Sequence, residues 1–186
     1  ISGDTPFGVP TKPTGSKKNT FELFEKKRSK DYIALYYIEK IVRKKAYVKR
    51  SAITKNAAAI DSYKVFIPEA SGSGSDPIVL GIPEYAPPPS ICSQSYLYAS
   101  FTDESAAKNF IAYLKTKFFR VLVSACKISQ HTSNKVYRFV PVQDFTSASD
   151  IDWSVSIPEI DQQLYAKYNL SAEEINFIET AIKPMD

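Results

Sequence analysis

The segment of residues 115–145, KTKFFRVLVSACKISQHTSNKVYRFVPVQDF, combines basic, aromatic, amide and hydroxyl side chains in one short stretch. Basic side chains suit the phosphates of a polyanion, and amide, guanidinium and hydroxyl groups suit the edges of nucleic-acid bases. The expected phosphate contacts are Lys115, Lys117, Arg120, Lys127, Lys135 and Arg138. The expected base contacts come from the polar loop of Gln130, His131, Thr132, Ser133 and Asn134. Taken alone, the loop fits a plain surface connection equally well.

A second basic block lies far away in the sequence. It consists of Arg43, Lys44, Lys45, Lys49 and Arg50. Residues 12–50 contain 13 Lys/Arg against 4 Asp/Glu, and residues 103–138 contain 7 against 2, whereas residues 144–186 contain 2 against 9. This asymmetry, which the net charge of +4 understates, favours a polyanion-binding face over an unevenly charged solvated surface.

Residues that usually build catalytic or metal sites are sparse. His131 is the only histidine, so a zinc site of the usual type or a Ser/Cys-His triad would depend on one residue. The glycines of GSGSD, residues 72–76, lack the lysine and the following helix of a phosphate-binding loop and indicate a turn. Glu25 and Lys27 have the E-x-K spacing of half a metal-dependent nuclease motif, which leaves a small nuclease as a minor alternative. No carboxylate pair for general acid–base catalysis can be singled out.

The composition is that of a globular protein, with 44% hydrophobic and 24% charged residues. Cys92 and Cys126 are too few for a disulfide framework and are expected to be reduced. No run approaches the roughly 20 apolar residues of a membrane span, and no secretory leader is recognisable, so a cytoplasmic protein is expected. Because the chain opens at Ile1 and its single methionine is Met185, we expect it to be part of a longer polypeptide.

Period-two alternation with β-branched and aromatic residues predicts strands at residues 31–38, 46–50, 60–70, 91–101 and 135–142. The first two are expected to form a hairpin or to be sheet neighbours, with the charged EKIVRKK as the turn between them. The prolines of residues 76–91 exclude a helix there. Residues 1–20, rich in Gly, Pro, Ser and Thr, are predicted to be a linker.

Helical periodicity is strongest after Thr102 and Asp103, either of which can cap the first turn. Apolar residues follow at helical spacing as far as Ala125, which predicts one helix of about six turns. Pro158 is well placed to begin a short helix, and Ser171 with Glu174 is a capping box for a last one. The predicted fold is therefore α+β: a mixed or antiparallel sheet packed by one long helix, with a C-terminal helical hairpin.

Three stretches of the sequence resemble a known family. They are DSYKVFIPEASGSGSD, PPPSICSQSYLYASFTDESAAKNFIAYLKTKFFRVLVSACKISQHTSNKVYRFVPVQDF and DQQLYAKYNLSAEEINFIETAIKPMD. Together they are similar to the C-terminal part of bacterial adenine-specific DNA methyltransferases of the Eco57I-like group, which belong to restriction-modification systems. The similarity extends over residues 60–186 and, more loosely through PFG, over the first 60. In that family this region follows the methyltransferase fold and is a target-recognition, or specificity, domain.

The resemblance implies a parent enzyme that methylates N6 of adenine in DNA, with S-adenosylmethionine bound in an upstream catalytic domain. This chain lacks the Gly-containing cofactor loop and the [NDS]-P-P-[YF] motif that holds a flipped adenine. DTPF at residues 4–7 has Thr5 where the first proline belongs, and YAPPPS lacks both the amide or acid and the aromatic residue. We therefore expect neither a cofactor nor catalytic residues in this chain.

The predicted organisation is a linker at residues 1–20, a DNA target-recognition domain at residues 21–145, and a helical hairpin at residues 146–186 packed on it. The expected partners are double-stranded DNA and a covalently linked upstream methyltransferase domain. The alternative is a protein-interaction domain that docks a methyltransferase or nuclease partner, with the basic face against an acidic partner surface.

Overall fold

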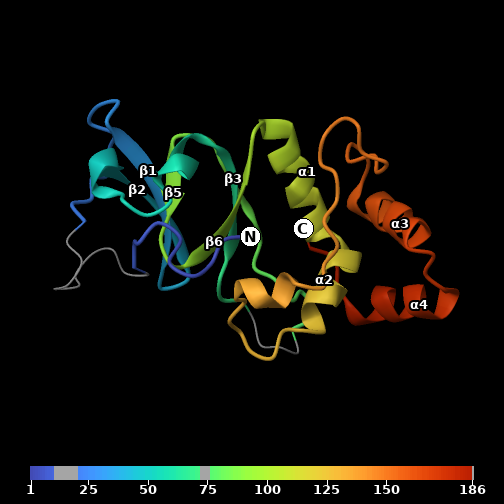
Figure 1. Ribbon diagram of the computed structural model, residues 1–186. Coiled ribbons are helices and arrows are strands. Elements are labelled where there is room, and N and C mark those ends of the chain that lie inside the picture. The colour runs from blue at the N-terminus through green and yellow to red at the C-terminus, as the bar shows by residue number, and fades with distance from the viewer. Residues whose placement is uncertain (11–20, 72–75, 186) are drawn as a thin grey trace.

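The computed structural model describes residues 1–10, 21–71 and 76–185, and the chain folds in successive layers (Figure 1). A first sheet has the strand order β2-β1-β5, and a second sheet has the order β4-β3-β6. Helices α1 and α2 pack beside the second sheet, and α3 and α4 form the layer beyond them. The predicted α+β class is confirmed, with two three-stranded sheets where a single sheet was expected.

The first sheet is built on an antiparallel hairpin of β1 (Tyr32–Glu39) and β2 (Val42–Lys49). The predicted hairpin is confirmed, but its turn is only the two residues Lys40 and Ile41, so the basic residues that were assigned to a turn belong to β2. Strand β5 (Ser90–Cys92) pairs parallel with β1 on the other side. Strand β2 is therefore an edge of this sheet, with η1 (Arg50–Ala52) directly after it.

The second sheet lies between the two hydrophobic cores of the molecule. It consists of β3 (Tyr63–Pro68), β4 (Glu84–Ala86) and β6 (Tyr96–Phe101), all antiparallel, and η2 (Ala57–Asp61) precedes it. On β3, Phe66 packs into the core shared with the first sheet, while Val65 and Ile67 pack into the core shared with the helices. Because side chains alternate between the faces of a sheet, this strand contributes residues to both cores and is buried on both faces.

The strand predicted at residues 91–101 is two strands that belong to different sheets. Strand β5 ends at Cys92 and β6 begins at Tyr96. Between them the Ser93 hydroxyl accepts a hydrogen bond from the Ser95 amide at 3.2 Å, and the Tyr96 amide donates to the Ser93 carbonyl at 3.1 Å. These serine contacts close a tight turn that moves the chain from the first sheet to the second. The alternation of apolar and polar residues continues through the turn, so it did not reveal the break.

The long helix predicted after Asp103 is two helices, α1 (Glu104–Lys115) and α2 (Lys117–Ser124). Asp103 caps α1, as predicted, by accepting from the Ala106 amide at 2.8 Å. Thr116 leaves the helical conformation, with ψ at 149°, and its hydroxyl caps α2 by accepting from the Phe119 amide at 3.1 Å. Asp161 accepts from the amides of Lys117 and Phe118 at 3.0 and 2.9 Å. The apolar periodicity continues through the break because both helices pack their apolar residues into the same core.

The prediction of a strand at residues 135–142 is wrong. The segment begins with the 3-10 helix η3 (Asn134–Tyr137) and continues without regular structure. Val136 and Tyr137 are consecutive and both buried. A strand covered on one face only would expose one of them, because consecutive side chains of a strand point to opposite faces. A few alternating residues therefore did not distinguish a strand from a short 3-10 turn.

The predicted C-terminal helices are present as α3 (Ile157–Lys167) and α4 (Ala172–Ala181). The expected capping box of Ser171 and Glu174 is confirmed, and Ser156 with Glu159 forms a second one at α3. Ile160, Leu164 and Ile178 are buried in the core that also contains α1 and the second sheet. The helical hairpin thus shares its core with the preceding region.

Residues 1–10 are not a free linker, which corrects the prediction for this part of residues 1–20. Phe7 and Val9 are 1% and 0% exposed in the core of the first sheet. The Ser2 amide donates to the Tyr98 carbonyl at 2.8 Å, and the Gln94 amide donates to the Val9 carbonyl at the same distance. The rest of the predicted linker, residues 11–20, lies outside the described residues, as does most of the predicted turn at residues 72–76.

Candidate nucleic-acid interface

One face of the edge strand β2 carries a row of cations. Arg43, Lys45 and Lys49 alternate with residues of the opposite face and are all exposed. The row extends over about 20 Å, because a strand rises about 3.3 Å per residue. The Lys45 ammonium lies 5.1 Å from the ring centroid of Tyr36 and 5.9 Å from that of Tyr47, which is within cation–π range. Edge strands commonly carry lysine because charge prevents pairing with another chain, so the row has a structural use as well.

The ion pairs of this basic block leave its charges accessible. The Arg43 guanidinium lies 3.5 Å from the Glu84 carboxylate, and Lys44 pairs with Glu39. Arg50 binds Asp61 with both terminal nitrogens, a hydrogen bond that lowers the pKa of the Asp61 carboxyl. Exposed ion pairs of this kind contribute about 0 to 1 kcal/mol, so a phosphate can replace the carboxylate at low cost.

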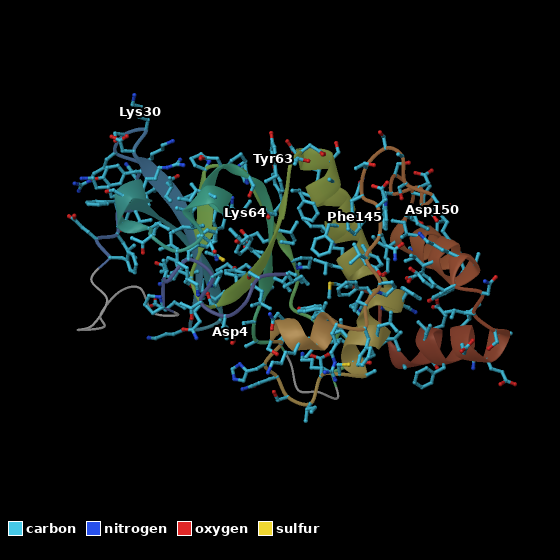
Figure 2. The ribbon with its side chains drawn as sticks, viewed as in Figure 1. Asp4, Lys30, Tyr63, Lys64, Phe145 and Asp150 are labelled. Carbon is cyan, nitrogen blue, oxygen red and sulfur yellow. The ribbon has the colours of Figure 1, made fainter. Side chains whose placement is uncertain are left out.

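The segment before β1 adds further cations beside the same strand. Phe24 and Tyr47 exchange backbone hydrogen bonds of 2.9 and 2.8 Å, which extends the edge of the first sheet. The Arg28 guanidinium carbon lies 3.6 Å from the centroid of the Phe24 ring. Lys30 projects from one end of the molecule, beside the first sheet, whereas Asp150 lies at the opposite end near α3 (Figure 2). The basic N-terminal part and the acidic C-terminal part of the sequence therefore lie at opposite ends of the molecule.

A groove brings part of the predicted polar loop next to the β1–β2 hairpin. The Thr132 amide donates to the Glu69 carbonyl at 2.7 Å, and the Ser71 amide donates to the Gln130 carbonyl at 3.1 Å. This pairing places the loop across from the hairpin turn and leaves a cavity of about 480 Å³. Its lining is Ile38, Lys40, Ile41, Arg43, Pro68, Glu69, Ala70, Ser71, Gly81, Ser95 and His131.

The groove joins the basic block of β2 to the predicted polar loop, because Arg43 and His131 both line it. Lys40 and Arg43 are the lysine and arginine of this lining. Glu69 is the acidic member, and burial raises the pKa of its carboxyl, with a further contribution from Asp4, while His131 opposes the shift. The groove therefore offers an anionic ligand more cationic than anionic groups.

Arg120 is a correction to the predicted interface. Its side chain is 0% exposed, so it cannot contact a phosphate at the surface. Its Nε donates to the Thr116 carbonyl and its Nη1 to the Ile78 carbonyl, both at 3.2 Å. The remaining Nη2 has no hydrogen-bond partner among the described residues, and burial lowers the pKa of the guanidinium. This arginine connects α2 to the segment after the second sheet's β3.

Lys127 is a second correction. It is 5% exposed, and its ammonium donates to the Ser71 carbonyl at 3.0 Å, to the Ser71 hydroxyl at 2.9 Å and to the Val79 carbonyl. All three donors are therefore used inside the protein, and burial lowers the pKa of the amine. Lys127 fixes the base of the polar loop and does not present a charge to a ligand.

The other predicted contact residues lie either in the helices α1 and α2 or in the loop and η3 that follow. Lys117 forms an ion pair with Glu179 of α4 at 2.6 Å, and the half-buried Lys115 ends α1, so both belong to the helical layers. The exposed residues of the loop and η3 are Gln130, His131, Asn134, Lys135 and Arg138, and Ser133 is half-buried. Thr132 is buried, so its hydroxyl does not reach a ligand. The structure thus confirms surface exposure for most of the loop and not for the lysines and arginine before it.

Sequence reasoning missed Lys40, Glu69 and Ser95 as residues of the groove. The Ser95 hydroxyl accepts from the Ile38 amide at 2.9 Å, which ties β1 to the turn before β6. Lys40 could have been recognised from the hairpin prediction, because a residue at a hairpin turn projects from the sheet. The other two depend on long-range backbone contacts that have no local signal: the Glu69 carbonyl accepts from the Thr132 amide, and the Ser95 carbonyl accepts from the Glu69 amide.

The half-motif of a nuclease lies in an exposed part of the chain. Glu25 and Lys27, the half-motif of a nuclease, are exposed in the segment before β1. Within residues 1–10, 21–71 and 76–185, no group of three His, Cys, Asp or Glu side chains is placed to bind a metal ion. Nor does any helix in this part of the chain have the length and apolar character needed to cross a membrane.

The chain was compared with models of protein families, with curated proteins and with solved structures. None of the three comparisons gives a match.

Proposed function

We propose that this chain is the DNA-binding target-recognition domain of a bacterial restriction-modification adenine-specific DNA methyltransferase. The observation that supports DNA as the ligand is the groove in which Arg43 and His131, 88 positions apart in the sequence, lie with Lys40 next to the exposed cations of β2. The resemblance of the stretches quoted from residues 60–186 to the C-terminal part of those enzymes suggests the identity of the parent.

In this proposal the two parts of the interface have different tasks. Arg43, Lys45 and Lys49 bind phosphates along one strand of the duplex, which supplies affinity without sequence preference. Gln130, His131 and Asn134 approach base edges, where a good contact contributes about 1 to 3 kcal/mol of discrimination. Binding of S-adenosylmethionine and methyl transfer are assigned to a covalently linked upstream domain.

The test is a fluorescence-anisotropy titration of random-sequence duplex DNA at about 50 and 200 mM salt, where four phosphate contacts would change the affinity about 100-fold. The test variant is Lys45→Ala/Lys49→Ala. The matched control is Lys108→Ala/Lys183→Ala, which removes the same charge from exposed positions on α1 and after α4. Lys127 is unsuitable for this purpose because its substitution would disturb the fold.

We expect the wild-type chain to bind with a strong salt dependence. The test variant should bind more weakly, and its slope of log affinity against log salt should decrease by about 2, since each lost contact contributes about 0.9. The control should retain nearly all of the wild-type affinity. Equal losses in both variants would show a general charge effect, and the absence of binding at the lower salt concentration would overturn the proposal.

A second candidate function is protein docking, and a separate apolar groove favours it. Helices α2 and α4 enclose about 410 Å³ lined by apolar residues and by Glu173 and Glu174. Phe177 on this groove is 62% exposed. A chain that binds no DNA but is protected here from hydrogen exchange by the methyltransferase domain would be a docking domain.

A further inference from the structure

The tip of the β1–β2 hairpin has an unusual composition for its geometry. Lys40 and Ile41 both have positive φ, at 49° and 64°, as the two central residues of a type I′ turn require. Asn-Gly is the common choice there, and a β-branched residue in this conformation is an outlier. Folding alone would favour another residue at this turn.

Ile41 is also the wrong residue for its exposure. Its side chain is 96% exposed, and that of the next residue, Val42, is 55% exposed. The tip is therefore apolar, strained and in contact with water. A residue that is unfavourable both for the backbone and for the solvent points to a role in contact with a partner.

The surroundings of Ile41 indicate the chemistry of that partner. Lys40, Arg43 and Lys44 are exposed next to Ile41 in the sequence, with Arg43 paired to Glu84 and Lys44 to Glu39, and Ile41 lines the groove that also contains His131. An apolar side chain with exposed cations beside it matches the edge of a base pair flanked by phosphates. The cations continue along β2 to Lys49, about 20 Å from Arg43, which suits a polyanion that follows the strand.

We propose that Ile41 is a wedge that inserts between adjacent base pairs of duplex DNA, while the neighbouring cations bind the flanking phosphates. Proteins that insert apolar side chains in this way partly unstack the base step and bend the duplex. The inference rests on the proposed DNA-binding function and adds to it a contact that is independent of charge.

The decisive variant is Ile41→Asn, since asparagine accepts positive φ and lacks the aliphatic side chain. Ile41→Leu retains an apolar side chain. Val142→Asn is the matched control, because Val142 is an aliphatic residue 92% exposed that lies outside the groove. Thermal unfolding of each variant, with an equal or higher midpoint expected for Ile41→Asn, shows that differences in binding do not come from unfolding.

The readouts are duplex affinity at two salt concentrations and bending of the duplex, measured by energy transfer between dyes at its ends. We expect Ile41→Asn to lower the affinity about tenfold at both salt concentrations, a factor suited to the burial of much of one aliphatic side chain. The salt slope should stay that of the wild type, because no phosphate contact is lost. Bending should be reduced in Ile41→Asn and retained in Ile41→Leu and Val142→Asn.

Three results would overturn the wedge. If the wild-type chain binds DNA and Ile41→Asn binds and bends it equally well, only the wedge fails and the proposed function stands. If the wild-type chain does not bind duplex DNA, both fail. If Ile41 is needed for co-sedimentation with phosphatidylserine vesicles but not for DNA binding, the tip is a membrane contact.

Discussion

The edge strand β2 and the helix α2 use the same residue types in opposite ways. Lys45 and Lys49 on β2 carry their charges in water, whereas Arg120 in α2 and Lys127 just after it carry theirs inside the protein, against backbone carbonyl groups. The sequence density of positive charge is high in both regions. A basic segment can therefore bind a ligand only where the fold leaves its charges exposed.

The largest effect is expected for Arg120→Ala, which would show how much the buried cations contribute to the fold. The substitution leaves the carbonyls of Thr116 and Ile78 without this donor and creates a cavity. We expect the free energy of unfolding to decrease by about 3 to 5 kcal/mol, measured by urea denaturation. Arg120→Met should lose less, because it fills the volume without a buried charge. A loss below about 0.5 kcal/mol for the alanine variant would remove the contrast with β2.

Asp161 extends the comparison to acids and gives it a pH dependence. Burial raises the pKa of its carboxyl from 3.8 to about 6, whereas the exposed Asp61, bound by Arg50, has a lowered pKa. Between pH 4 and 6 the folded chain retains a proton at Asp161 that the unfolded chain has released, so this group's contribution to stability falls as the pH rises. The predicted fall is about 2 kcal/mol, since each pKa unit corresponds to about 1.4 kcal/mol.

Urea denaturation at pH 4 and pH 6.5 measures this effect as a difference between the wild type and Asp161→Asn. The asparagine variant cannot ionise and should show a smaller loss on raising the pH. Asp61→Asn is the exposed control and should alter the pH profile in the opposite direction. Parallel profiles for the wild type and Asp161→Asn would contradict the assignment.

A smaller and opposite effect is expected at the tip of the exposed hairpin. Ile41→Asn should raise the free energy of unfolding by about 1 kcal/mol, because the left-handed conformation costs a β-branched residue about 1 to 2 kcal/mol. Chemical denaturation gives the value, and Val142→Asn should leave it nearly unchanged. A destabilised Ile41→Asn would mean that the tip makes a contact within the fold.

The smallest change in stability is expected for Lys45→Ala/Lys49→Ala on β2. Both side chains are exposed, so the free energy of unfolding should change by less than about 0.5 kcal/mol. The same urea titration measures it beside Arg120→Ala. A loss of several kcal/mol would place these lysines with the buried cations and weaken their assignment to a ligand.

Local patterns in the sequence predicted the elements whose signals are complete within a few residues. The β1–β2 hairpin was predicted from the β-branched and aromatic residues of its strands. The Asp103 cap and the Ser171–Glu174 capping box were predicted because a side chain there bonds to nearby backbone amides. The exposed members of the candidate site, Arg43 on β2 and His131 in its loop, were also named from their residue types. Their meeting in one groove was not, because it depends on backbone pairing between residues 69–71 and 130–132.

Residue types and their spacing were enough to predict the α+β class, the positions of most helices and strands, and the division of charge between the two ends of the chain. Contacts between distant elements explain why the helix breaks at Thr116, where Asp161 from α3 accepts from the amides of Lys117 and Phe118. Such contacts also explain why Arg120 and Lys127 are buried while the lysines of β2 are exposed. The reason is physical: propensity and capping act over one or two turns, whereas burial and long-range hydrogen bonds are set by elements that are distant in the chain.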